Sequence, residues 1–205
     1  MPYALTQEQR DLIEWLRDGE RIKTKFERRE SESMRNVPVK IKRLHPDATV
    51  PQYATAGAAG FDLVAVEDVI IAPGETVKVR TGLAFELPPG YELQIRPRSG
   101  ISAKTKLRVA NAPGTVDEDF RGEVCVLIDN ISPVPPVTDE WTQTRAIDGE
   151  YIYGTKAPEG TYLIRKGERI AQGILAEVPR ASFIVTDELT ETERGEGSFG
   201  STGVS

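Results

Sequence analysis

From Val39 onward, the chain alternates short apolar runs with breaks rich in glycine and proline. The runs contain many β-branched and aromatic residues, and they predict strands at 39–44, 61–66, 76–80, 91–95, 124–128 and 162–164. Short strands with frequent turn signals are typical of an all-β sandwich or barrel, and not of alternating strands and helices. The predicted fold class is therefore all-β.

Residues 6 to about 28 follow a helical pattern instead. Thr6 and Gln9 have the spacing of a capping box, and apolar residues recur along one face at Leu12, Trp15, Leu16, Ile22 and Phe26. We expect this stripe to pack on the main body, with a neighbouring subunit as the alternative. Because a polar linker follows at 27–36, we predict an N-terminal helical extension at 1–37 and a β domain at 38–186.

Two further segments depart from the strand pattern. Residues 133–160 open with Pro133-Val-Pro-Pro136 and continue with polar and aromatic residues, which predicts a long surface insertion and not a core strand pair. The tail at 187–205 is acidic and then glycine-rich, with an arginine, hydroxyl groups and a lone phenylalanine. Such a tail can wrap a nucleotide, because backbone N–H groups and hydroxyls suit phosphate and a ring can stack on a base.

The composition narrows the classes of function. The 205 residues fit one domain with appendages. No stretch approaches the roughly 20 apolar residues of a membrane helix, and the N-terminus has no apolar signal region, so we expect a cytoplasmic protein without a membrane partner. The net charge of −6 argues against broad nucleic-acid binding.

The chain has one histidine and one cysteine, which excludes a zinc site built from these residues. Cys125 lies in an apolar run and is expected to be a buried small hydrophobe. The sequence Leu-His-Pro-Asp predicts that His45 is a surface residue in a turn. Any general base must therefore be a carboxylate.

Five segments combine glycine with charged, hydroxyl or amide side chains, at 59–63, 96–100, 111–122, 167–173 and 194–203. Each alone is most often a turn, but sites are commonly assembled from distant loops on a β scaffold. In this order the segments resemble the five signature motifs of the trimeric dUTPases, over residues 38–132 and 161–203. The resemblance implies a jelly-roll-like (β-clip) fold and a homotrimer whose three active sites each combine all three subunits. It also implies hydrolysis of dUTP to dUMP and pyrophosphate.

In the same family, residues 111–122 would form a β-hairpin that accepts deoxyuridine. The resemblance implies that Asn111 and the backbone at Gly114 and Val116 read the uracil edge. The ring of Phe120 would lie under the deoxyribose, where a 2′-hydroxyl would collide with it. The family usually has tyrosine at this position, so we expect the ring contact to persist and any hydroxyl contact to be lost.

The chemistry is likewise implied by the match. Asp117 corresponds to the general base, which activates the water that attacks the α-phosphorus. Asp62 corresponds to an acid that supports this network, with a strand-end acid holding a turn or an arginine as the alternative. The phosphate-binding positions are matched by Arg98, Ser99, Gly100 and Gln172. Mg²⁺ is expected to be held by the triphosphate and waters, without metal ligands from the protein.

The tail matches the segment that closes over the substrate in the family, at Arg194, Phe199, Gly200, Ser201 and Thr202. Ser198 stands where the family commonly has glycine. Two alternatives remain open at this point. One is a dCTP deaminase-like enzyme of the same fold, and the other is a dUTPase-like scaffold that binds a protein partner through 133–160 or the N-terminal helix.

Overall fold

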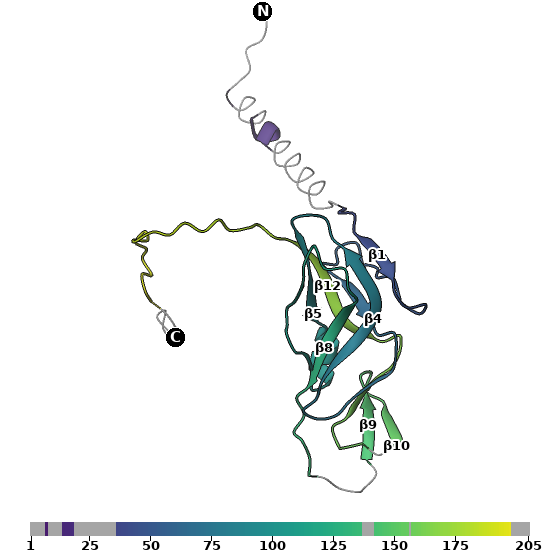
Figure 1. Ribbon diagram of the computed structural model, residues 1–205. Coiled ribbons are helices and arrows are strands. Elements are labelled where there is room, and N and C mark those ends of the chain that lie inside the picture. The colour runs from purple at the N-terminus through teal and green to yellow at the C-terminus, as the bar shows by residue number, and fades with distance from the viewer. Residues whose placement is uncertain (1–6, 8–13, 19–35, 137–141, 156, 198–205) are drawn as a thin grey trace, which may run out of the picture.

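A computed structural model describes residues 7, 14–18, 36–136, 142–155 and 157–197 of the chain. Within these ranges the body consists of strands β1 to β12 and one short helix, α2 (Ser99–Lys104), as Figure 1 shows. The strands form three four-stranded sheets. The predicted all-β class is therefore confirmed, and each of the six predicted strands is present.

The first sheet has the order β1-β4-β8-β6, and its strands are β1 (Lys40–Arg43), β4 (Thr76–Glu86), β8 (Val124–Asn130) and β6 (Leu107–Val109). In β8, alternate residues are buried, as expected for a strand with one face on the core. The ladder between β4 and β8 shifts register between Arg80 and Leu83, which marks a β-bulge in β4.

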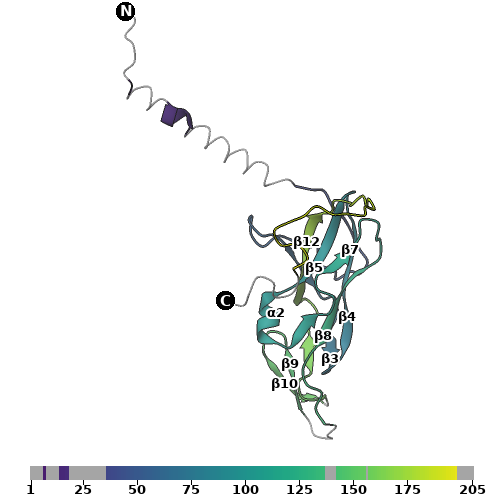
Figure 2. The same cartoon turned by 90° about the vertical axis from the view of Figure 1, so that its left-hand side faces the viewer.

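The third sheet carries most of the residues that were predicted to bind a nucleotide. Its order is β2-β12-β5-β7, with β2 (Phe61–Val64), β12 (Arg169–Glu177), β5 (Tyr91–Pro97) and β7 (Gly114–Val116). Figure 2 shows β12, β5 and β7 at one end of the body, with α2 farther along it. Leu93 and Ile95 of β5 are buried, while the intervening Gln94 and the terminal Arg96 point away from the core.

The second sheet corrects one expectation. Its order is β10-β9-β11-β3, with β10 (Tyr151–Thr155), β9 (Thr142–Ala146), β11 (Tyr162–Ile164) and β3 (Val69–Ile71). The prediction that residues 133–160 contain no core strand pair is wrong, because β9 and β10 form a hairpin and β9 also pairs with β11. The hairpin turns at Asp148-Gly149, where Gly149 has a φ of +105°, and an Asp-Gly pair is a strong hairpin signal.

Apolar side chains from all three sheets form one buried cluster. Asn130 is the large polar residue within it, at 1% exposed. Its Nδ2 donates to the carbonyls of Ile71 (3.0 Å) and Gly160 (2.9 Å), and its Oδ1 accepts from the backbone N–H of Ser132 at 3.0 Å. These bonds satisfy the buried amide and tie the first sheet to the second.

The two ends of the chain differ from the body. Residues 14–18 are helical, and the rest of the helix predicted for 6–28 lies outside the described residues except for Gln7, which is also helical. Trp15 and Leu16 are 70% and 53% exposed. These two members of the stripe do not pack on the main body as expected, because no described side chain covers them. No helix among the described residues has the length and apolar character to cross a membrane.

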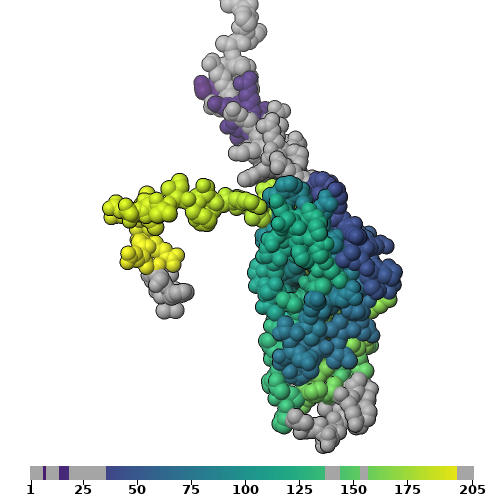
Figure 3. Space-filling model, viewed as in Figure 1, coloured from purple at the N-terminus to yellow at the C-terminus, as the bar shows by residue number. Residues whose placement is uncertain are grey.

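An arm follows β12 and leaves the body at the end away from the β9–β10 hairpin (Figures 1 and 3). At its start, the Val178 N–H donates a hydrogen bond to the Gly90 carbonyl at 2.8 Å, which continues the pairing of β12 with β5. Beyond this point every described side chain up to Glu196 is exposed, including Phe183 at 93% and Val185 at 98%. The boundaries of the extension, the β domain and the tail remain predictions.

Candidate active site

One face of the third sheet gathers polar side chains. Gln172 of β12 lies opposite Asp62 of β2 on one side and opposite Arg96 of β5 on the other. Residues directly opposite each other in a ladder point to the same face. The strand registers therefore bring the predicted residues Asp62 and Gln172 together, with Arg98 at the end of β5.

Asp62 and two arginines form what we call the arginine cluster (Asp62, Arg98 and Arg169). Arg98 Nε donates to Asp62 Oδ1 at 2.9 Å, and Arg169 Nη1 donates to Asp62 Oδ2 at 3.2 Å. Arg98 Nη1 also donates to the carbonyl of Arg169 at 3.3 Å. One carboxylate thus orients two guanidinium groups, and the cluster keeps a net positive charge that suits an anion.

Arg169 is a residue that the sequence analysis missed. The segment 167–173 was read for Gln172 alone, although Arg169 stands three positions earlier in the same segment. Its side chain is 58% exposed. The contact of Arg169 with Asp62 depends on the pairing of β12 with β2, and such strand neighbours cannot be read from one sequence.

Ser99 and Gly100 begin α2, directly after Arg98. The first N–H groups of a helix have no partner within the helix. Both residues are exposed, and a Cβ on Gly100 would meet nothing within 4 Å. The start of α2 is therefore open to the close approach of a phosphate beside the arginine cluster.

Residues 111–123, which we call the Asp117 loop, lie on the other side of β5. Gly114 pairs with Ile95 and Val116 with Leu93. Within 111–122 the described strand is β7, which pairs with β5, and the segment links the antiparallel strands β6 and β8. The expected β-hairpin is thus closed by β6 and β8, and not by pairing within 111–122. Pro113 cannot donate to a ladder, which favours a break before β7.

The start of the Asp117 loop is narrow. A Cβ on Gly114 would lie 3.2 Å from Asn111 Nδ2 and 3.3 Å from Ile95 Cβ. The amide of Asn111 thus lies against Gly114, where an added side chain would crowd it and Ile95. Asn111 is itself exposed, so its amide is available to a ligand beside this strand.

The ring of Phe120 lies against Gly122. It is 44% exposed, and a Cβ on Gly122 would come within 2.6 Å of its Cζ. The Phe120 N–H donates to the Asp117 carbonyl at 3.2 Å, which closes a turn between the two residues. The loop therefore presents a flat apolar ring three positions after a carboxylate.

Asp117 opens onto a hollow of about 360 Å³ whose lining is Gly90, Tyr91, Glu92, Thr115, Asp117, Glu118, Asp119, Val178 and Arg180. Glu118 Oε2 accepts from the Gly90 N–H at 2.6 Å, and Glu118 Oε1 lies 3.9 Å from Arg180 Nη2. Asp117 itself is exposed and forms no ion pair with any other residue that the structure describes. Its carboxylate is thus available to a water molecule in the hollow.

The arginine cluster and Asp117 lie at opposite ends of β5. Asp117 shares its hollow with Glu92, near the start of β5, whereas Arg98 follows the end of the strand. The strand rises about 3.3 Å per residue, so the span from Glu92 to Arg98 is about 20 Å. Within one chain, Asp117 and Arg98 are too far apart to act on the same phosphorus atom.

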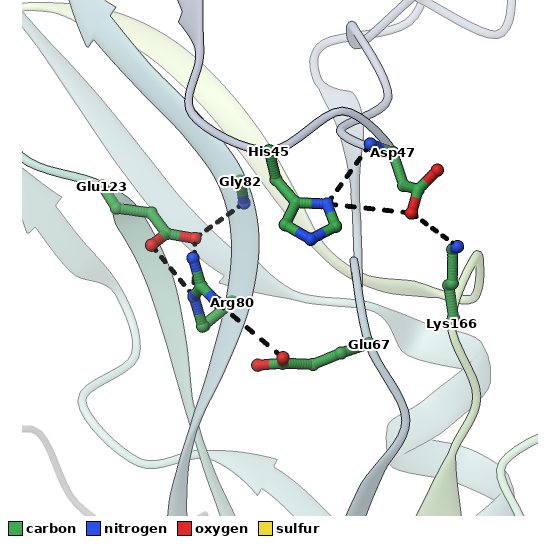
Figure 4. Close-up of polar contacts among 7 residues, drawn as sticks. All are labelled: His45, Asp47, Glu67, Arg80, Gly82, Glu123 and Lys166. Carbon is green, nitrogen blue, oxygen red and sulfur yellow. Dashed lines mark hydrogen bonds and ion pairs between the residues drawn. The ribbon is translucent and has the colours of Figure 1, made fainter.

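Neither His45 nor Cys125 offers an alternative base. His45 Nδ1 accepts from the backbone N–H of Asp47 at 3.2 Å, in the surface turn predicted for it (Figure 4). Cys125 is partly buried rather than fully buried as expected, and this burial, together with the charge of Glu123, raises the pKa of its thiol. A thiol with a raised pKa is a poor nucleophile at neutral pH.

The tail residues are placed only in part. Arg194 Nε donates to the Gly197 carbonyl at 3.0 Å, within the tail itself. The predicted residues Phe199, Gly200, Ser201 and Thr202 lie outside the described residues, as does Ser198. Within the described ranges, no group of three or more histidine, cysteine, aspartate or glutamate side chains could hold a metal ion.

The family model for dUTPase matches residues 46–135. A deoxyuridine 5′-triphosphate nucleotidohydrolase of Nautilia profundicola is 46% identical over 165 residues, covering 80% of this chain and 98% of the relative. The corresponding protein of Thermobifida fusca is 45% identical over 82% of this chain and 79% of its own length.

Solved structures agree with these relatives. The dUTPase of Staphylococcus bacteriophage 80alpha with dUPNHPP has a TM-score of 0.74 at 31% identity, covering 82% of this chain and 99% of its own. A mutant of the dUTPase of phage phi11 of S. aureus, described with a structural Mg(II) ion, has a TM-score of 0.63 at 25% identity, covering 74% of this chain and 97% of its own. On the sequence, the fold and the placement of the matched residues, the chain belongs to the dUTPase family.

Proposed function

We propose that the protein hydrolyses dUTP to dUMP and pyrophosphate, by attack of water on the α-phosphorus. Asp117 is the general base of this reaction. It is an exposed carboxylate beside a hollow of about 360 Å³, and the histidine and cysteine lie elsewhere.

The separation of about 20 Å along β5 supports an active site shared between copies of the chain. One copy supplies the Asp117 loop and a second supplies the arginine cluster with Ser99, Gly100 and Gln172. We propose a homotrimer, in which the third copy supplies the tail. The exposed apolar side chains of the arm support this assembly, because residues such as Phe183, Ile184 and Val185 find cover only on another chain.

In this site the arginine cluster binds the phosphates. The guanidinium of Arg98 and the N–H groups at the start of α2 neutralise the charge that builds on the phosphate oxygens as the α–β bond breaks. Asp62 acts on Arg98 and Arg169 by orienting them, since both of its carboxylate oxygens accept from a guanidinium. This role corresponds to the alternative considered for Asp62, an acid that holds an arginine.

The Asp117 loop selects the nucleoside. Asn111 and the backbone around Gly114 and Val116 bind the uracil edge, where the Asn111 amide and Ile95 crowd Gly114. The ring of Phe120 packs under the deoxyribose and excludes a 2′-hydroxyl. After substrate binds, Arg194 and the hydroxyls of Ser201 and Thr202 close on the outer phosphates, with Gly200 allowing close approach and Phe199 stacking on the base.

Mg²⁺ fits this site as an ion carried by the substrate. Mg²⁺ keeps several waters and commonly binds substrate phosphates rather than an all-protein cage. Asp62 is already paired with two arginines, so its carboxylate is engaged on the protein side of the site. The ion would neutralise phosphate charge, while Arg98 and Gln172 bind the same phosphates from the protein side.

The test is pyrophosphate release from a panel of dUTP, dTTP, dCTP and UTP with Mg²⁺. We expect turnover of dUTP alone, and a loss of about 100-fold or more in kcat for Asp117→Asn, the usual range for a lost general base. The matched control is Asp119→Asn, which lines the same hollow and should retain most of its activity. Wild-type turnover by Asp117→Asn would overturn the assigned base, and ammonia released from dCTP would overturn the reaction.

A further inference from the structure

Glu123 is the last residue of the Asp117 loop, and it lies in none of the five segments that resemble the family motifs. We propose that Glu123 is a positioning residue that holds the Phe120 ring in place for the deoxyribose, and so sets the discrimination between dUTP and UTP. The proposal rests on the proposed function for the identity of the substrate. The bonds of Glu123 to Arg80 and Gly82 fix the end of the loop, and we call them the anchor (Figure 4).

The anchor is built on the β-bulge of β4. Gly82 lies in the bulge with a φ of +68°, so its N–H points out of the ladder with β8. That N–H donates to Glu123 Oε1 at 2.8 Å. A bulge N–H without a ladder partner is thereby satisfied by a side chain from the loop.

Arg80 also binds the carboxylate of Glu123. Its Nε lies 3.2 Å from Oε1 and 3.1 Å from Oε2 of Glu123, and the Glu123 side chain is only 19% exposed. Glu67 lies farther from Arg80, with Oε2 3.8 Å from Nη1. The hydrogen bond to Glu123 is the main reason that the pKa of Arg80 is raised. Glu123 therefore accepts from two donors on β4 that are two residues apart.

The bulge cannot easily move away from Glu123. A Cβ on Gly82 would lie 2.8 Å from His45 Cβ, 2.9 Å from Ala48 Cβ and 2.9 Å from Val66 Cγ1. On the same side, the Leu44 N–H donates to the Gly82 carbonyl at 2.8 Å. Gly82 is thus packed on one side and bound to Glu123 on the other, which makes it a fixed point.

Gly122 links the bound Glu123 to the ring of Phe120. Glu123 directly follows Gly122, whose Cα hydrogen faces the Phe120 ring. The first half of the loop has its own anchor, the bond from the Gly90 N–H to Glu118. Without Glu123, the second half would lose its bonds to β4, and the surface against which the ring packs could shift. A shift of about 1 Å can cost up to 100-fold in an enzyme reaction.

The experiment compares Glu123→Ala with Glu123→Gln in the full chain. Gln keeps the length and an acceptor oxygen for the Gly82 N–H, so it should restore most of the function lost in Ala. For Glu123→Ala, we expect the ratio of kcat/KM for dUTP to that for UTP to fall about tenfold, mainly through a higher KM for dUTP. The matched control is Glu75→Ala, which removes an exposed glutamate just before β4 that accepts from the Ala72 N–H at 2.9 Å, at the end of the strand away from Glu123.

A readout without substrate separates this proposal from the proposed function. Hydrogen–deuterium exchange of the backbone at 117–123 should accelerate in Glu123→Ala and stay unchanged in Glu75→Ala. Arg80→Met leaves the bond from the Gly82 N–H to Glu123 in place, so exchange at 117–123 should increase less than in Glu123→Ala. This variant also tests the anchor if Glu123→Ala does not fold. Unchanged exchange in both Glu123→Ala and Arg80→Met would overturn the anchor. Faster exchange with an unchanged dUTP/UTP ratio would overturn the positioning role, whereas a wild-type enzyme inactive on dUTP would overturn the proposed function alone.

Discussion

At the scale of single residues, glycines determine where the Asp117 loop can bring side chains together. Gly114 lies under the amide of Asn111, and Gly122 lies under the ring of Phe120. Neither glycine has a positive φ, so the requirement at both positions is space and not backbone conformation. The side chains that we propose to contact the substrate thus depend on neighbours that have no side chain at all.

Gly122→Ala tests this dependence. The added Cβ would come within 2.6 Å of the Phe120 ring, so the ring must swing away. We expect the KM for dUTP to rise about tenfold with little change in melting temperature, because the ring is partly exposed and can move into solvent. Gly57→Ala is the control, since its Cβ would meet nothing within 4 Å. A wild-type KM for Gly122→Ala would contradict the packed position of the ring.

Most candidate residues could be proposed from the sequence, because a motif lists residue types in order. Asp62, Arg98 and Gln172 were proposed in this way, and the strand registers bring them together. Arg169 and Glu123 were missed for a physical reason. Their partners lie 107 and 43 residues away in sequence, and only the sheet registers reveal such pairs.

At the scale of elements, strands with regular alternation could be predicted and interrupted ones could not. β4 continues six residues past its predicted end, because the bulge at Gly82 breaks the alternation. β12 was read as a turn around Gly167 and Gly173. Gly173 lies inside the strand, where a Cβ would come within 2.5 Å of the Phe61 ring. The glycine is thus explained by close packing, which is invisible in a sequence.

The β9–β10 hairpin provides a prediction on stability and pH. Asp148 Oδ1 accepts from the Glu150 N–H at 2.9 Å, and Oδ2 accepts from Arg165 Nη1 at 2.8 Å. The bond from the Glu150 backbone is the main reason that the pKa of Asp148 is lowered. Asp148→Ala should therefore lower the melting temperature at pH 7, by a small amount because the side chain is 45% exposed.

The sign of the pH dependence follows from the lowered pKa of Asp148. A carboxyl whose pKa is lower in the folded state stabilises the fold above its unfolded pKa, which is about 4 for aspartate. The difference between wild type and Asp148→Ala should shrink as the pH falls below about 4. Glu159→Ala, an exposed acid in the next loop, serves as the control. A difference that grows on acidification would refute the linkage.

At the scale of the whole molecule, the distance along β5 supports the proposal that more than one chain takes part in one reaction. In the proposed reaction Asp117 and Arg98 act at one α-phosphorus, yet they lie at opposite ends of β5 in a single copy. On this proposal the assembly is part of the active site. This could be expected from the resemblance, but the reason for it, two functional groups at opposite ends of one strand, required the register of β5 with β7.

Mixed assemblies test this sharing. Asp117→Asn and Arg98→Ala chains should each be nearly inactive alone. Co-expressed in equal amounts, they should recover about a quarter of wild-type activity, because random mixing joins an intact Asp117 to an intact Arg98 at that fraction of head-to-tail interfaces. Co-expression of Asp117→Asn with Asp117→Ala should recover nothing. The absence of recovery in the first mixture, with mixed assemblies verified by mass, would contradict the shared site.

The exposed arm after β12 makes the protein susceptible to proteolysis at one place. Residues 186–196 follow the apolar side chains that we propose to dock on another chain; they are exposed, and no strand of the body includes them. A protease could therefore nick this stretch and leave the three sheets folded and assembled. If the tail closes on the substrate as we propose, such a nick would end turnover, and the working lifetime of the enzyme would then be shorter than that of its fold.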